Sequence, residues 1–200
     1  MAFVDLRADV ESWAIRSDFP TSIYNLATAR INRSLRVQQM LEQYSEIAAR
    51  EITLPTNFLA FDQLKGTTSG YDFPIDPVTP YTMASGDNPS GVPEGYSIAN
   101  GLTGRVMRLN PAPSGPYPLS GMYFAKLANL VNDADTNLVL EDFPDIYLSA
   151  CLAYAFGWMQ DTEQMTIHSQ NMATQIDLAN QEYSQNRYSA PLQSVPVNSA

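Results

Sequence analysis

The two side chains best suited to nucleophilic or acid–base chemistry each occur only once in this sequence. The chain has one histidine, His168, and one cysteine, Cys151. Both lie on the apolar stripe of a predicted helix, so an antiparallel helix pair would bring them together as a thiol–imidazole dyad. Buried cysteines usually behave as small apolar residues, and histidines on such stripes usually serve packing. We therefore favour the packing role and predict no catalytic residue.

Residues 133–137 start like a calcium-binding loop, because oxygen-bearing side chains stand at alternate positions. Leu138 then occupies the position that needs glycine for a sharp turn, and Pro144 occupies the position of the bidentate glutamate. We predict a turn or helix cap there and no metal site. Because the sequence also lacks a glycine-rich phosphate loop and a G-x-S-x-G motif, we expect no cofactor and no enzymatic activity.

Three arginines, Arg30, Arg33 and Arg36, follow one another at three-residue steps along one side of a predicted helix. Such a strip can present positive charge to a phosphate backbone or to an acidic neighbouring subunit. The chain as a whole has 11 Lys plus Arg against 21 Asp plus Glu, a formal net charge of -10. A subunit or channel contact, or a solvated face, is therefore the favoured interpretation, and DNA contact is the second one.

The composition indicates one sizeable core and a polar surface suited to protein contacts. A chain of 200 residues that is 44% hydrophobic allows one domain with a smaller attached element. Only 16% of residues are charged, which favours surfaces that meet other proteins. The single cysteine fits a reducing cytoplasm. The acidic start argues against a secretory signal, and the apolar stretch 150–159 is shorter than the about 20 residues of a membrane helix.

Helical periodicity is present towards both ends of the chain. Apolar residues at steps of three and four predict helices over 5–16, 22–51 and 161–187 and another helix from residue 144. The helix over 22–51 is the longest, and Trp13 is the expected packing anchor of the first helix. Pro144 suits the first position of a helix, and Asp161 suits an N-cap.

Between the helices, the pattern favours short strands and a long loop. We predict strands over 58–64, 96–99, 104–110 and 122–127, with Asn100-Gly101 as a hairpin turn. Proline and glycine crowd residues 66–95, which predicts a loop without a lasting strand ladder. The aromatic residues of this loop are docking candidates: Tyr71, Phe73 and Tyr81.

The last residues, 188–200, predict an extended tail, because isolated apolar residues alternate with prolines. Such a tail can clasp a neighbouring chain. The candidate contact residues of this tail are Tyr188, Pro191, Leu192, Val195 and Val197.

Several longer motifs are more specific than any of these features. The first half contains Trp13-Ala-Ile-Arg-Ser-Asp, Leu26-Ala-Thr-Ala-Arg-Ile-Asn-Arg-Ser-Leu-Arg-Val and Leu54-Pro-Thr-Asn-Phe-Leu. The second half contains Thr136-Asn-Leu-Val-Leu and Pro144-Asp-Ile-Tyr-Leu-Ser-Ala-Cys-Leu-Ala. In order and spacing these segments resemble the head-to-tail adaptor proteins of tailed bacteriophages. The resemblance covers most of residues 5–187, although the loop 66–95 has no counterpart in it.

The resemblance and the periodicity imply one fold class, α+β and mainly α. In this fold, N- and C-terminal helices form a bundle with a small inserted antiparallel β-region and an extended C-terminal tail. We expect the N-terminal helices of the bundle over 1–54 and the β-insertion over 55–130, with its Pro/Gly-rich loop at 66–95. The C-terminal helix pair is expected over 131–187 and the tail over 188–200.

The resemblance also implies a structural virion protein that forms a ring, commonly of twelve subunits, joins the portal to the tail and lines the genome-ejection channel. The expected partners are other copies in a homo-oligomeric ring, the portal protein, tail or nozzle proteins, and passing double-stranded DNA bound without sequence specificity. No membrane is expected. The expected location is the head-to-tail interface of the virion, after assembly in the host cytoplasm. The alternative is another tail or capsid accessory protein, also not an enzyme.

Overall fold

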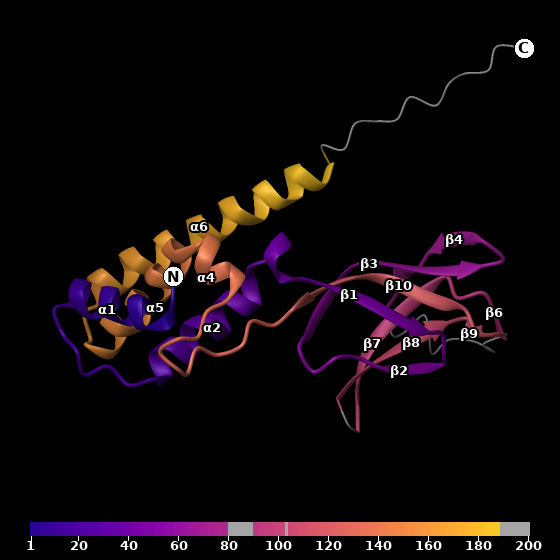
Figure 1. Ribbon diagram of the computed structural model, residues 1–200, viewed down its shortest axis with the longest axis horizontal. Coiled ribbons are helices and arrows are strands. Elements are labelled where there is room, and N and C mark those ends of the chain that lie inside the picture. The colour runs from indigo at the N-terminus through magenta and orange to yellow at the C-terminus, as the bar shows by residue number, and fades with distance from the viewer. Residues whose placement is uncertain (80–89, 103, 189–200) are drawn as a thin grey trace, which may run out of the picture. The chain divides into compact units, whose positions relative to one another are not determined.

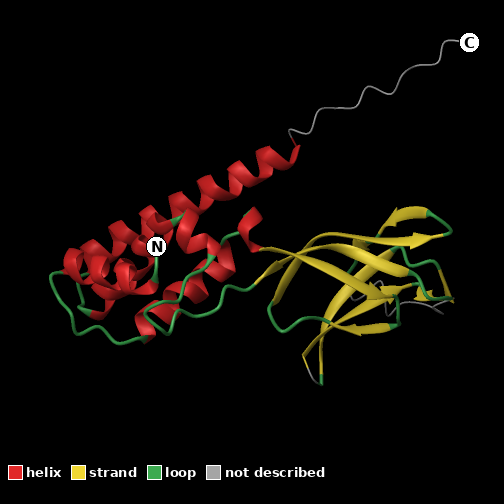
Figure 2. Ribbon diagram, in the orientation of Figure 1, coloured by secondary structure: helices red, strands yellow, loops and turns green. Residues whose placement is uncertain are grey.

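A computed structural model describes residues 1–79, 90–102 and 104–188 of the chain. The chain folds as two compact units, which Figures 1 and 2 show as a helix-rich and a strand-rich part. The helical unit comprises Met1–Gln39 and the chain from Leu127 onward, and the β unit comprises Met40–Lys126. Among the described residues, no helix combines the length and apolarity needed to span a membrane.

The expected fold class is wrong, because the chain is not a mainly α bundle with a small β-insertion. About 42% of it is helical and 29% is strand. In the described ranges the strands form three sheets and build a core of their own. The physical reason is that strand pairing recruits segments that precede the expected insertion, namely residues 41–47 and 51–53 of the predicted long helix and its end.

The helical unit is organised around one buried helix, α5. The helices of the unit are α1 (Phe3–Ala14), α2 (Ser22–Ser34), α4 (Leu138–Asp142), α5 (Pro144–Trp158) and α6 (Thr162–Tyr188). α5 packs against α1, α2 and α6, because its small buried residues Ala150, Cys151 and Ala155 let neighbouring backbones approach. The predicted helices from 5, 144 and 161 are confirmed. Asp161 caps α6 as predicted, since its side chain accepts from the Gln164 N–H at 3.1 Å.

The predicted helix over 22–51 is wrong in its second half. α2 ends at Ser34, the backbone of Leu35 is extended, and residues Gln38–Met40 form a 3-10 turn before the strand β1 (Leu41–Ile47). The reason is a contact distant in sequence. The Asn180 amide donates to the Ser34 carbonyl at 3.0 Å and accepts from the Arg36 N–H at 2.7 Å, so a side chain of α6 satisfies the end of α2. β1 then pairs with β10 along its whole length.

The β unit packs two four-stranded sheets against each other. The strands are β1 (Leu41–Ile47), β2 (Glu51–Thr53), β3 (Phe58–Thr68), β4 (Tyr71–Pro74), β5 (Asp76–Pro77), β6 (Ser90–Gly91), β7 (Gly95–Gly101), β8 (Gly104–Asn110), β9 (Ala112–Pro113) and β10 (Pro118–Ala125). The sheet orders are β1-β10-β3-β4 and β2-β8-β7-β5, and β6 pairs with β9. Aromatic rings join the two sheets, since Phe61 of β3 meets Tyr96 of β7 edge to face at 5.3 Å.

The predicted strands are confirmed with shifted bounds, but two turn predictions are wrong. Asn100 and Gly101 pair with Arg105 and Gly104 inside the β7–β8 ladder, so the turn follows Gly101. The predicted loop 66–95 contains the hairpin β3–β4, whose turn residues Ser69 and Gly70 both have positive φ. A ladder persists there because a turn with positive φ at both central positions matches the twist of the flanking strands.

Candidate interaction surfaces

Both tryptophans of the chain are exposed on the helical unit, beside the connection from α1 to α2. Trp13 is 61% exposed and Trp158 is 44% exposed, so Trp13 is not the buried anchor that we expected. The Arg16 guanidinium lies over the Trp158 ring, 4.8 Å from its centroid. Arg16 also pairs with Asp18, and this hydrogen bond lowers the pKa of the Asp18 carboxyl. We call Trp13, Ile15, Arg16 and Trp158 the tryptophan surface.

Ile15 combines an unfavourable backbone conformation with an exposed apolar side chain. It ends α1 in the left-handed region, with φ 52° and ψ 41°, where a β-branched residue is disfavoured and glycine is usual. Its side chain is 92% exposed, so packing within the chain does not compensate for the strain. Strained residues of this kind gather at functional sites. Ile15 is therefore a candidate contact residue.

An apolar cavity of about 430 Å³ continues from the tryptophan surface between α2, α5 and α6. Trp158 lines both, and the other lining residues include Leu26, Met165 and Met172, together with Arg30. Methionine side chains are flexible and adapt to different partners. Aromatic residues, methionine and arginine are the residue types enriched where proteins meet. The helical unit thus presents a continuous surface of the composition expected for an interface.

The β unit presents a different kind of surface, an open sheet edge beside a cleft. β1 pairs only with β10 among the described strands. A cleft of about 310 Å³ lies next to it, lined by residues 43–46 and 53–55. Tyr44 lines this cleft and is 5% exposed, and its hydroxyl has no hydrogen-bond partner in the described part of the chain. Burial raises the pKa of Tyr44 to about 12.

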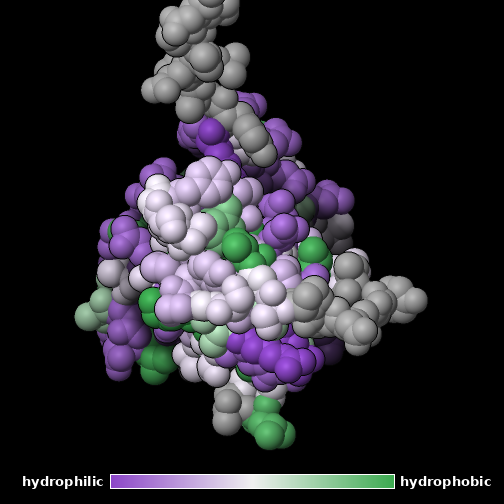
Figure 3. Space-filling model, turned by 90° about the vertical axis from the view of Figure 1, so that its right-hand side faces the viewer, coloured by the Kyte–Doolittle hydropathy of each residue, from purple (hydrophilic) through white to green (hydrophobic). Residues whose placement is uncertain are grey.

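Elsewhere the β unit shows no broad apolar patch. Its exposed large apolar residues in the described ranges are Ile47, Tyr71, Val92 and Leu102, which lie in or directly after four different strands. In Figure 3, which views the end of the β unit, hydrophobic groups appear only in small separate patches among polar ones. Scattered apolar residues are normal on a soluble surface. The edge of β1 is therefore the feature of this unit that points to a partner.

The three arginines do not form a strip on one continuous helix. Arg30 and Arg33 are exposed on α2, whereas Arg36 follows its end. Arg33 donates to the Ala29 carbonyl at 3.2 Å, and Arg36 donates to the Asn32 carbonyl at 3.0 Å. The bond to Asn32 satisfies a carbonyl of the last turn of α2, a common role of basic residues at helix ends. A channel or subunit contact of the three side chains stays a prediction.

Cys151 and His168 are held in packing environments. Cys151 is fully buried in α5, and burial raises the pKa of its thiol, which disfavours the reactive thiolate. The His168 ring stacks on Phe156 with centroids 5.3 Å apart and meets Trp13 at 6.3 Å. Burial lowers the pKa of His168. These contacts fit the packing role that we favoured.

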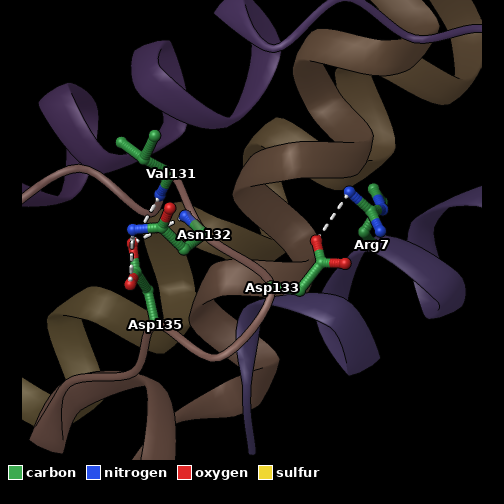
Figure 4. Close-up of polar contacts among 5 residues, drawn as sticks. All are labelled: Arg7, Val131, Asn132, Asp133 and Asp135. Atoms are coloured by element: carbon green, nitrogen blue, oxygen red, sulfur yellow. Dashed lines mark hydrogen bonds and ion pairs between the residues drawn. The ribbon is translucent and has the colours of Figure 1, made fainter.

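The acidic segment 131–137 forms a turn, shown in Figure 4, and supplies a helix cap at Asn137. The Asp135 carboxylate accepts the N–H groups of residues 131 and 132, both at 2.8 Å, and these bonds lower its pKa. Asp133 pairs with Arg7 at 3.0 Å, and Asn137 caps α4 by accepting the Leu140 N–H at 2.8 Å. The predicted turn and cap are confirmed. Within the described residues, no group of three or more His, Cys, Asp or Glu could hold a metal.

The loop and tail candidates divide into core, exposed and undescribed residues. Phe73 is 8% exposed and packs in the core of the β unit, so in this structure it is a core residue. Tyr71 is 68% exposed. Tyr81 lies outside the described residues, as do the tail candidates Pro191, Leu192, Val195 and Val197. α6 runs to Tyr188.

Sequence reasoning missed Ile15 and Tyr44 as site residues. No local pattern marks a strained isoleucine, because most residues that follow a helix adopt other conformations. Tyr44 was assigned to a helix, and its unpartnered hydroxyl follows only from strand packing. The two missed residues lie on the two surfaces that carry the strongest signs of a partner.

Comparison with known families agrees with the resemblance drawn from the motifs. A family model described as SU10 adaptor protein matches residues 1–195, which includes both units and both surfaces. No curated protein matches the chain. The chain therefore belongs to the SU10 adaptor protein family and is a phage adaptor-type protein.

Proposed function

We propose that this chain is a subunit of a head-to-tail adaptor ring, which joins the portal to the tail of the virion and lines the channel for the genome. The observation that carries the proposal is the tryptophan surface, where the only two tryptophans of the chain lie exposed beside a strained, exposed isoleucine. A chain that acts alone gains nothing from this arrangement. The chain belongs to a phage adaptor family, so contact with other virion components is the expected role of such a surface.

The residue types of the tryptophan surface suit a tight protein contact. Tryptophan and arginine dominate the residues that cost the most binding energy when truncated. Arg16 is held over Trp158 before any partner arrives, so less side-chain freedom is lost on binding. The adjoining cavity provides a recess for an apolar side chain of the partner. We assign this surface to the contact with the portal or with the next subunit.

The charge of the chain supports a role as channel lining. Each copy carries a formal net charge of -10, and a ring of such copies repels DNA wherever its acidic groups face the lumen. DNA then passes without sequence-specific binding. This part of the proposal requires no active site and no cofactor.

Native mass measurement of the full chain, alone and mixed with the portal protein, tests the proposal. We expect a closed ring of about twelve copies, the number common in such adaptors, that binds the portal. A chain that stays monomeric in the presence of the portal would contradict the ring. Binding to another tail or capsid component instead would favour an accessory role.

One substitution tests whether the tryptophan surface makes the contact. Ile15→Asp places a charge on a side chain that is almost fully exposed, so folding tolerates it, but an interface there does not. Leu102→Asp is the matched control, because Leu102 is also exposed but lies in the β unit, directly after β7. We expect loss of assembly with Ile15→Asp alone. Equal assembly of both variants would remove Ile15 from the contact.

A further inference from the structure

β1, with seven residues and no proline, is the longest outer strand in the described part of the β unit. The other outer strands of the two large sheets are β4, β5 and β2, and each is short. β5 has two residues and ends in Pro77, and β2 has three. β4 ends in Pro74, at a position that faces away from β3, because the neighbouring Ile75 N–H donates to Leu64 in β3. Short strands and prolines are the usual protection of an edge.

The backbone groups of β1 that face outward can be identified from one hydrogen bond. The Ala48 N–H donates to the Tyr117 carbonyl at 2.8 Å, in the register that pairs β1 with β10. Because hydrogen-bonding direction alternates along a strand, Tyr44 and Glu46 also face β10, whereas Gln43, Ser45 and Ile47 face away. Three consecutive outward positions are therefore ready to pair with another strand.

The cleft beside this edge is lined by a residue whose buried hydroxyl is unsatisfied. Tyr44 lines it, is almost fully buried, and has a hydroxyl without a partner among the described residues. Buried hydroxyls are rarely left unpaired, and an exception calls for a group that the visible chain does not supply. A strand added to β1 would run beside Tyr44 and cover the cleft.

We propose that residues 192–197 of a second copy add to β1 as an antiparallel or parallel edge strand. This contact belongs to the proposed ring and deepens it. The twelve residues 189–200 follow α6 and reach about 40 Å when extended. Residues 192–197 span about 20 Å, which matches the seven residues of β1. The contact joins two different patches of the subunit, as a closed ring requires.

The sequence of this segment fits an edge strand. Pro196 lacks an N–H, so it must face away from β1, and Val195 and Val197 then direct their backbone groups towards β1. Residues that pair directly lie on the same face of a sheet. Ser194 and Pro196 therefore lie on the face of Tyr44, and Val195 and Val197 lie on the face of Ser45.

Charge favours this occupant over a second β1. β1 carries Glu42 and Glu46, and two antiparallel β1 strands centred on Tyr44 would place Glu42 opposite Glu46, which is destabilising. Residues 188–200 contain no Asp, Glu, Lys or Arg. The tail therefore approaches the acidic edge without repulsion.

Disulfide trapping between two differently tagged full-length copies tests the pairing, because side chains that alternate in direction along a strand should cross-link at different rates. One copy carries Ser45→Cys, and the other carries Val195→Cys, Ser194→Cys or Val197→Cys. Cys151 is fully buried and does not interfere. We expect cross-links to residue 45 from positions 195 and 197 several times faster than from position 194, because position 194 faces the opposite side of the sheet. Equal rates at the three positions would overturn the proposal.

Further variants keep the test independent of folding and of the ring. Ser45→Pro removes an outward N–H. It should abolish the cross-link between Gln43→Cys in the same copy and the tail cysteine of the other copy, whereas Ser45→Ala should preserve this cross-link. The circular dichroism of both variants should be unchanged. Cross-linking found only within a chain that carries both cysteines would overturn pairing between copies. Native mass measurement reads the ring separately. If rings form without the alternating cross-links, the strand pairing is refuted and the proposed function is not. If the alternating cross-links form without rings, the strand pairing is supported and the proposed function is refuted.

Discussion

Replacing Ile15 by glycine should stabilise the helical unit and weaken its assembly. In the folded chain Ile15 occupies the left-handed region with a β-branched side chain, and a non-glycine residue pays about 1–2 kcal/mol there. Glycine removes this strain. It also increases the freedom of the unfolded chain, which costs about 0.5–1 kcal/mol.

The side chain itself contributes little to folding. It is 92% exposed, and because full burial of an isoleucine is worth about 1.5–3 kcal/mol, the buried fraction contributes about 0.2 kcal/mol. The balance predicts that Ile15→Gly raises the free energy of unfolding by about 0.5 kcal/mol. Ile15→Ala is the matched control, since alanine removes the exposed atoms but keeps the strained Cβ. We expect no gain from alanine.

Urea unfolding followed by circular dichroism measures the free energy, and native mass measurement of the same samples measures assembly. A gain in stability together with weaker assembly indicates that the strain is retained for the contact, a known compromise at functional sites. A loss of stability of more than about 0.5 kcal/mol in Ile15→Gly would refute the reasoning, because it would show that the side chain supports the fold.

Three further predictions concern stability. Asn180→Ala removes both hydrogen bonds from α6 to the end of α2, so urea unfolding should show a loss of about 2 kcal/mol, and an unchanged midpoint would contradict this account of where α2 ends. A Cβ at Gly66 would lie 2.4 Å from the Phe73 ring, whereas Gly115 has open space. Gly66→Ala should therefore cost about 1–3 kcal/mol and Gly115→Ala should not, and equal melting temperatures would argue against the packing of Phe73. Burial chiefly raises the pKa of Tyr147 to about 12. Because the tyrosine of the unfolded chain ionises first, the stability that neutral Tyr147 contributes is complete below pH 10 and is lost as pH rises towards 12. Tyr147→Phe should make alkaline unfolding less steep, and an identical pH profile would contradict the shift.

Much of the helical unit was predictable because its signals are local. The stripe of α6 repeats within a few residues, and Pro144 and Asp161 mark helix starts by their own chemistry. The Asp135 turn and the Asn137 cap likewise depend on bonds to residues within four positions. The family also follows from motifs that are short continuous stretches of sequence. The sequence by itself determined these features, because each depends on neighbours along the chain.

The end of α2, the strand β1 and both candidate surfaces were decided only by the tertiary structure. Residues 41–47 carry good helix formers, but Asn180 closes α2 and β10 offers a complete ladder, so long-range pairing outweighs local propensity. The exposure of Trp13, the strain at Ile15 and the unpartnered hydroxyl of Tyr44 arise when distant segments meet. The physical reason is that burial and hydrogen-bond satisfaction are properties of the packed chain, and no window of sequence contains them.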